Sequence, residues 1–196
     1  MAELIDFPPL TWAGVTARLT HRACDAPCRA RLTCERTSLI VSLEEVGGRT
    51  AVGDSAAVRA PAFSLGEHVS FVAGPSEVWE ASEPIRHHRR VTILFEDEEQ
   101  CATLRRRPSR FMFADRTILA CAQRLAAECE SGGEAGSLYG AAVAMALSDA
   151  VAGVVPEETG GGLAPWQLKK VQDYLRAHIA DAVTMAELAA LAGLSE

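Results

Sequence analysis

Three cysteines and one histidine lie close together near the N-terminus and are the first candidates for chemistry. Cys24, Cys28 and Cys34 follow His21 within a short stretch, and thiolates with imidazole are preferred zinc ligands. The spacing lacks the paired C-x-x-C knuckles of structural zinc sites, so unreactive thiols are the alternative interpretation. The acidic Met-Ala-Glu-Leu-Ile-Asp start carries no export signal. We therefore expect free thiols, no bound metal or cofactor and a cytoplasmic location.

A pocket for a small molecule needs a few polar or aromatic groups among apolar ones. His21, Arg31, Trp79 and His87 are the candidates between residues 15 and 95, and Arg18 and Arg86 are further arginines that such a pocket could use. Each could equally fill a core or decorate an exposed strand. No Ser-His-Asp or Cys-His-Asn arrangement and no Gly-rich phosphate loop is recognisable. The sequence therefore predicts binding rather than catalysis.

The charge of the chain limits how it can meet nucleic acid. Its 26 acidic residues outnumber 19 basic ones, giving a net charge of -7. A protein that contacts DNA phosphates over its whole surface needs clustered Lys and Arg. Because this chain is acidic overall, any DNA contact must be local. Two basic clusters, at 87–90 and 105–110, are interpreted as solvated faces or ion-pair partners.

The elements that must position these residues follow two sequence patterns, one typical of strands and one typical of helices. Val15, Ala17 and Leu19 alternate with polar residues, the period of a half-buried strand. About seven or eight such strands fit before residue 96, which favours a closed or nearly closed small barrel, and an acidic stretch at 96–99 marks its end. Further strands are predicted at 38–43, 69–73 and 91–95.

Beyond residue 110, Ala and Leu recur at helical spacing and predict an amphipathic helix around 118–126. A second helix at 138–152 completes an antiparallel hairpin, which we expect to pair two copies of the chain. The longest apolar run, 141–155, is interrupted by polar residues and falls short of the ~18 residues that cross a membrane. We expect no membrane contact.

Residues 156–162 include three consecutive glycines and mark a linker. Pro165 then stands where a first helical turn tolerates proline. Thr184 and Glu187 have the spacing of a capping box, which begins a further helix that ends at Gly193. The predicted organisation is a barrel at 1–112, a helical hairpin at 113–155, a linker at 156–163 and a second helical unit at 164–196.

The last residues meet the steric demands of a helix-turn-helix. Ala189 is small where two helices would cross closely, and Gly193 supplies a positive backbone angle at the turn. Leu194 would fill the space between the helices, and Ser195 would cap the next one. Together with Thr184 and Glu187, these residues form a partial DNA-binding motif.

At residues 162–175 and 185–195 the chain resembles the opening of an AraC/XylS-type DNA-binding domain. The resemblance implies two helix-turn-helix units and DNA as a partner. A recognition helix would begin directly after Ser195, whereas the sequence stops at Glu196. We therefore expect an incomplete DNA-binding unit that binds DNA poorly by itself.

The stretch 63–74 resembles a strand of the cupin-like regulatory arm of the same family. The implied fold class is α+β, with a small cupin-like antiparallel β-barrel, a helical hairpin and the first helices of a helix-turn-helix domain. Enzymatic cupins bind metal through a His-x-His pair, and this chain lacks one. Glu67 and His68 are neighbours, so on a strand they point to opposite faces.

The leading hypothesis is a cytoplasmic, dimeric transcription regulator whose barrel senses an unidentified small effector. The alternative is a metal-dependent or metal-free cupin enzyme acting on a small molecule. A third possibility is a truncated partner that sequesters full-length regulators through the hairpin.

Overall fold

The computed structural model describes residues 3–59 and 66–154, together with 170–171, 174–175, 183–184 and 187–189 of the C-terminal part. The chain divides into two compact units, Met1–Glu157 and Glu158–Glu196. Each unit is described by itself.

The described part of the first unit contains ten strands and three helices. The strands are β1 (Glu3–Asp6), β2 (Leu10–Trp12), β3 (Val15–Cys24), β4 (Cys28–Cys34), β5 (Ser38–Val46), β6 (Thr50–Gly53), β7 (His68–Val72), β8 (Ser76–Ser82), β9 (Ile85–Phe95) and β10 (Arg110–Phe113). The helices are α1 (Glu98–Arg105), α2 (Arg116–Ser131) and α3 (Ser137–Val154). The predicted α+β class, with antiparallel strands followed by helices, is confirmed.

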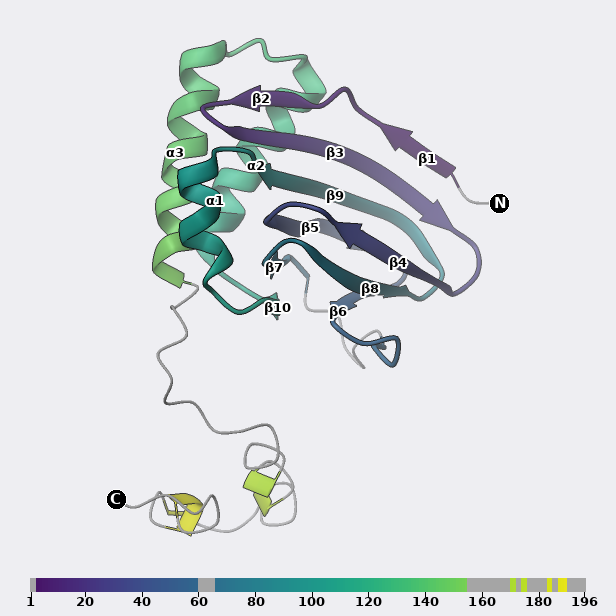
Figure 1. The fold of residues 1–196 in the computed structure, drawn as a ribbon. Coiled ribbons are helices and arrows are strands. Elements are labelled where there is room, and N and C mark those ends of the chain that lie inside the picture. Colours follow the sequence, from purple (N-terminus) through teal and green to yellow (C-terminus); the bar gives the residue numbers. More distant parts are fainter. Residues whose placement is uncertain are drawn as a thin grey trace. The chain divides into compact units, whose positions relative to one another are not determined.

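Two antiparallel sheets pack against each other. The larger has seven strands in the order β1-β3-β9-β5-β7-β10, with β2 alongside β3, and the smaller has the order β4-β8-β6. Figure 1 shows the three helices gathered on one side of the strands. The larger sheet therefore has helices on one face and the smaller sheet on the other.

Strand alternation decides which core each residue joins. On β3, Ala17 and Leu19 belong to the main apolar core, which also contains Ile118 and Leu125 of α2. Residues of the opposite parity face the smaller sheet, where Ile40, Val52, Val72 and Val78 form a second, smaller core. We call the space between the two sheets the inner layer.

The two sheets meet along one side and separate along the other, so of the two predicted forms the barrel is the nearly closed one and not the closed one. On the closed side, the Val52 amide of β6 donates to Met112 Sδ of β10 at 3.4 Å. On the other side, β3 already pairs with β9 along one edge and with β1 and β2 along the other. Since both edges of β3 are occupied, β4 cannot pair with it, and the described part of β4 pairs only with β8.

The acidic stretch at 96–99 begins a helix rather than merely ending a strand. Glu98 and Glu99 occupy the first turn of α1, where carboxylates interact favourably with the free backbone N–H groups of a helix start. Cys101 and Leu104 of α1 are 3% and 2% exposed in the main core. The sequence interpretation missed this helix.

Helix α2 is capped at both ends. Asp115 Oδ1 accepts from the Ile118 amide at 2.9 Å, and Gly132 ends the helix with φ 73 in the left-handed region that favours glycine. The hairpin partner α3 packs on α2 through a buried face that includes Val143, Ala144 and Leu147.

The outward face of α3 is apolar. Leu138 is 84% and Met145 is 63% exposed. By length and composition alone, this 18-residue helix with mean hydropathy 1.4 could cross a membrane, which the sequence interpretation excluded. Only 28% of the residues of this helix are buried, and Leu138 and Met145 are among those that stay exposed in the described structure.

Two arginines fasten the end of α3. Arg107 Nη1 donates to the Ala152 carbonyl at 2.7 Å, and Arg110 Nη1 donates to the Val154 carbonyl at 3.0 Å. Cations suit a helix C-terminus because its last carbonyls lack partners. Part of the second basic cluster therefore serves as a helix cap.

Candidate functional site

The inner layer holds a set of buried polar side chains. His68 of β7 is 2% exposed, and its Nε2 lies 3.4 Å from Glu45 Oε1 and 3.4 Å from Thr50 Oγ1. The Thr50 amide donates to Glu45 Oε1 at 2.9 Å, and the Thr50 hydroxyl donates to the same oxygen. Three strands, β5, β6 and β7, thus supply one hydrogen-bonded group.

A register shift places Glu45 in this group. The β5–β9 pairing is irregular between Ser42 and Glu44, and an extra residue in a strand reverses the faces that follow. The Glu45 side chain is therefore 1% exposed, whereas that of Glu44 is 54% exposed. Burial raises the pKa of Glu45, but hydrogen bonds from His68 and Thr50 outweigh burial and leave this pKa below its usual value.

A second group centres on Glu80 of β8. Its side chain is 4% exposed, and it accepts from Arg22 Nη2 at 2.5 Å and from Arg90 Nη1 at 2.8 Å. Burying one carboxylate between two guanidinium groups leaves an excess positive charge. Such a network holds its members in place because each buried charge needs its partners.

His88 of β9 links this group to β5. Arg22 Nη2 lies 3.5 Å from His88 Nδ1, and Ser42 Oγ lies 3.0 Å from His88 Nε2. Guanidinium can only donate, which assigns Nδ1 as the acceptor and makes Nε2 the donor to Ser42. Burial, followed by the charges of Arg22 and Arg90, lowers the pKa of His88 to about 3, so the ring is neutral at physiological pH.

A cavity of about 460 Å³ opens beside Arg90. It lies where β4 diverges from the larger sheet, and β3, β5 and β9 supply the rest of its wall. This volume falls within the range of small-molecule sites, roughly 300–1,000 Å³. Its lining comprises Arg18, Leu32, Thr33, Cys34, Glu35, Arg36, Ser38, Ile40, Arg90, Thr92 and Leu94.

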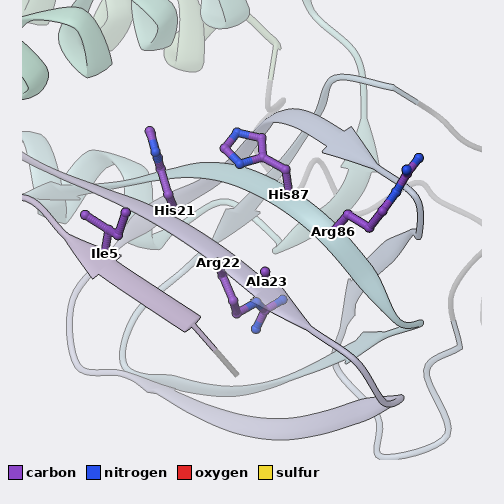
Figure 2. Close-up of a pocket in the computed structure, with 6 residues that line it drawn as sticks. All are labelled: Ile5, His21, Arg22, Ala23, Arg86 and His87. Carbon is purple, nitrogen blue, oxygen red and sulfur yellow. The ribbon is translucent and has the colours of Figure 1, made fainter. Parts of the chain in front are cut away.

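The four residues predicted for an effector pocket lie outside the inner layer. Figure 2 shows His21 and His87 on one side of β3 and β9, with Arg22 pointing to the other side. The two imidazole rings lie 5.3 Å apart, edge to face, beside a hollow of about 150 Å³. Arg31 and Trp79 are paired across β4 and β8, with parity opposite to that of the inward Val78.

The cysteine group shows no metal-binding arrangement. Cys24 Sγ donates to the Glu83 carbonyl at 3.7 Å, and Cys28 is exposed. Within residues 3–59, 66–154 and the described C-terminal positions, no three His, Cys, Asp or Glu side chains come together to hold a metal ion. His68 and Glu45 are two possible metal ligands that lie together. Among the described residues, no third His, Cys, Asp or Glu side chain completes a metal site with them.

The second unit contains the capping box. Glu187 Oε2 accepts from the Thr184 amide at 2.8 Å, and Thr184 Oγ1 accepts from the Glu187 amide at 3.3 Å. Glu187, Leu188 and Ala189 are helical, and Ala189 is half-buried. Gly193, Leu194 and Ser195 lie outside the described residues.

Sequence reasoning missed Glu45, Glu80, His88 and Arg90 as site residues. The run at 87–90 carries one usable signal, because on a strand it must split into two faces. His88 and Arg90 share the parity that faces away from the Val91, Ile93 and Phe95 side of the core. The side chains that contact them come from β3, β5 and β8, and only the folded structure shows which ones these are.

No family model and no curated protein matches the chain. Among solved structures, it is similar to a cupin superfamily protein from Desulfitobacterium hafniense, with 14% identity over 48% of this chain and 79% of that chain and a TM-score of 0.35. It is also similar to the AraC-like transcriptional activator CuxR, with 12% identity over 99% of this chain and 70% of that chain and a TM-score of 0.47. With TM-scores this low, neither similarity assigns a function, and the chain's own residues must carry it.

Proposed function

We propose that this chain is the sensing part of a transcription regulator, with a second unit that begins a helix-turn-helix. The observation that carries the proposal is the reciprocal Thr184–Glu187 capping box, which is followed by helical residues that include the small Ala189. The motif through Ser195 is the sequence context in which such a helix becomes the first helix of a DNA-reading pair.

In this proposal the first unit senses and the second responds. The inner layer has a cavity of about 460 Å³ beside buried charges, which supports effector binding. An effector that favours one arrangement of the protein shifts the population toward that arrangement. DNA affinity then follows the population, with no catalytic step.

The proposal includes a homodimer formed through the helical hairpin. The groove between α2 and α3 has a volume of about 510 Å³ and includes Ala120, Ala142 and Ala146. Small residues allow close helix approach, and Leu138 and Met145 offer exposed apolar surface beside the groove. Two copies would present two DNA-reading units to a two-fold symmetric site.

Fluorescence anisotropy with DNA from upstream of the chain's own gene tests the proposal. The protein is assayed as given and also extended through any reading frame that continues after Glu196. We expect the extended protein to bind with a steep salt dependence and the 196-residue chain to bind weakly. A Gly193→Val substitution should weaken binding by the extended protein, and Ala102→Ser, on the exposed face of α1, should not.

One outcome would contradict the incomplete DNA-binding unit, and another would contradict the function itself. The first is sequence-selective, tight binding by the 196-residue chain alone, which would remove the need for a further helix. The other is no DNA binding by the extended protein together with a stoichiometric transition metal in elemental analysis, which would favour the enzyme alternative.

A further inference from the structure

The inner-layer cavity combines an apolar wall with uncompensated positive charge. Leu32, Ile40 and Leu94 contribute apolar surface from β4, β5 and β9. Three arginines and one glutamate complete the charged part of the lining: Arg18, Arg36, Arg90 and Glu35.

Pairing with acids outside the cavity does not cancel this charge. Arg90 shares Glu80 with Arg22, so these three side chains together keep one positive charge. Arg36 lies 4.0 Å from Glu96 on the exposed rim, and Glu35 offsets one more cation. The region around Arg18 and Arg90 therefore stays positive, where an anion would be attracted.

Two residues of the wall each have a polar atom without a hydrogen-bond partner within the described structure. Ser38 is fully buried, and its Oγ has no hydrogen-bond partner within the described structure. Arg90 Nε is likewise buried and unpartnered there. A buried donor without an acceptor is costly, and both side chains line this cavity. Both atoms are themselves covered by the surrounding protein, so they add to the polarity of the wall and make no direct ligand contact.

We propose that the cavity between β4 and the β5–β9 face binds a small carboxylate with an apolar body. The carboxylate would lie near the Arg18 and Arg90 side chains, and the apolar body would contact Leu32, Ile40 and Leu94 toward β4. This inference rests on the proposed function, because it names the chemical class of the effector.

Protection of Cys34 from alkylation reports the binding directly. Cys34 lines the cavity and is half-buried, whereas Cys28 lies outside it and is exposed. The whole chain is alkylated with iodoacetamide, with or without millimolar 4-phenylbutyrate or octanoate, and the sites are resolved by peptide mass spectrometry. Both carboxylates should slow alkylation of Cys34 and leave that of Cys28 unchanged. The neutral amides of the same acids should protect roughly tenfold less or worse.

Two substitutions that break no other contact in the described structure sharpen the test. Arg18→Gln should raise the carboxylate concentration needed for protection several-fold, whereas Ser38→Ala, which removes a covered hydroxyl, should leave it nearly unchanged. Arg106→Gln, an exposed arginine beyond the cavity, is the matched control. Equal protection by acid and amide, or no protection by either carboxylate, would overturn the site.

The result is independent of DNA binding. If Cys34 is protected but the extended protein binds no DNA, the carboxylate site is supported and the proposed regulator function is contradicted. If the extended protein binds DNA but Cys34 is not protected, the regulator function is supported and the carboxylate site is contradicted.

Discussion

Arg90 Nη1 donates to Glu80 Oε2 at 2.8 Å. This contact joins the two sheets through a pair of opposite charges. Glu80 lies on β8 of the smaller sheet and Arg90 on β9 of the larger one. With Arg22 on the other carboxylate oxygen, a single acid holds two cations in place.

Replacing Glu80 by Gln should destabilise the fold. Loss of the carboxylate charge leaves Arg22 and Arg90, each only 20% exposed, without their counter-charge. Breaking a buried pair costs about 3–5 kcal/mol, and we expect the lower part of that range in urea unfolding.

Glu77→Gln on the same strand is the matched control. Glu77 and Arg31 form an exposed pair, 57% and 59% accessible, and such pairs contribute about 0–1 kcal/mol. Equal unfolding free energies for the two variants would show that the inner pair contributes nothing.

Stability should fall as the pH drops below the usual pKa of histidine. The folded chain holds the pKa of His88 at about 3 instead of 6.5, so between those values the unfolded chain binds the proton first. The free energy of unfolding should therefore decrease with falling pH, by up to ~1.4 kcal/mol per pH unit from this residue. Glu45, whose pKa lies below 4.5, adds its own loss only at lower pH.

Urea unfolding between about pH 5 and pH 7 isolates the histidine contribution. In His88→Gln, the amide can still accept from Arg22 and donate to Ser42, and the pH slope should become shallower. His87→Gln, on the other face of β9 and 40% exposed, should keep the slope of the unsubstituted chain. An unchanged slope in His88→Gln would contradict the assignment.

Gly140 must remain glycine because Trp12 occupies the space of its side chain. A Cβ at this position would lie 2.2 Å from Trp12 Nε1 and 2.3 Å from Cδ1. Gly140→Ala should cost ~1–3 kcal/mol through overpacking, although alanine is the better helix former. Tryptophan fluorescence should shift as the ring moves.

Gly153→Ala in the same helix is the control, because no atom lies within 4 Å of its added Cβ. It should be neutral or stabilising by up to ~1 kcal/mol. A stabilising Gly140→Ala would contradict the observed packing.

Charge on the outward face of α3 should separate the proposed dimer. Leu138 and Met145 are seven residues apart, so they share a helix face, and both are mostly exposed. Leu138→Glu or Met145→Glu should raise the dimer dissociation constant roughly tenfold or more in analytical ultracentrifugation.

Ala102→Glu adds the same charge to an exposed position of α1 and should leave the association unchanged. A monomer at every concentration that also sediments with lipid vesicles would contradict the dimer and assign the apolar face to a membrane.

Local periodicity predicted the strands that alternate cleanly. The predicted runs 38–43 and 91–95 fall within β5 and β9, the run 69–73 overlaps β7 except for its last residue, and the two-helix hairpin corresponds to α2 and α3. Strand β4 was not predicted, because Arg29 and Arg31 on its exposed face and Cys28 and Cys34 at its ends obscure the pattern. The sequence left open whether the barrel closes completely, and it does not, because β1, β2 and β9 occupy both edges of β3 in a strand order that the sequence does not reveal.

The inner polar groups depend on pairings between strands distant in the sequence. Arg22 and Glu80 are 58 positions apart, and Ser42 and His88 are 46 apart. The irregular register near Ser42 also turns the Glu45 side chain inward. The residue types near this position do not predict the irregularity. By contrast, the Thr184–Glu187 box is a local motif, and its spacing alone predicts the contact.

The two arginines at the end of α3 have a mechanical consequence. Arg107 precedes β10 and Arg110 begins it. Both side chains donate hydrogen bonds to backbone carbonyls in the last turn of α3. The last turn of α3 is thus tethered to β10, an edge strand of the larger sheet. Any displacement of that strand would be passed to the end of α3 through these two hydrogen-bonded side chains.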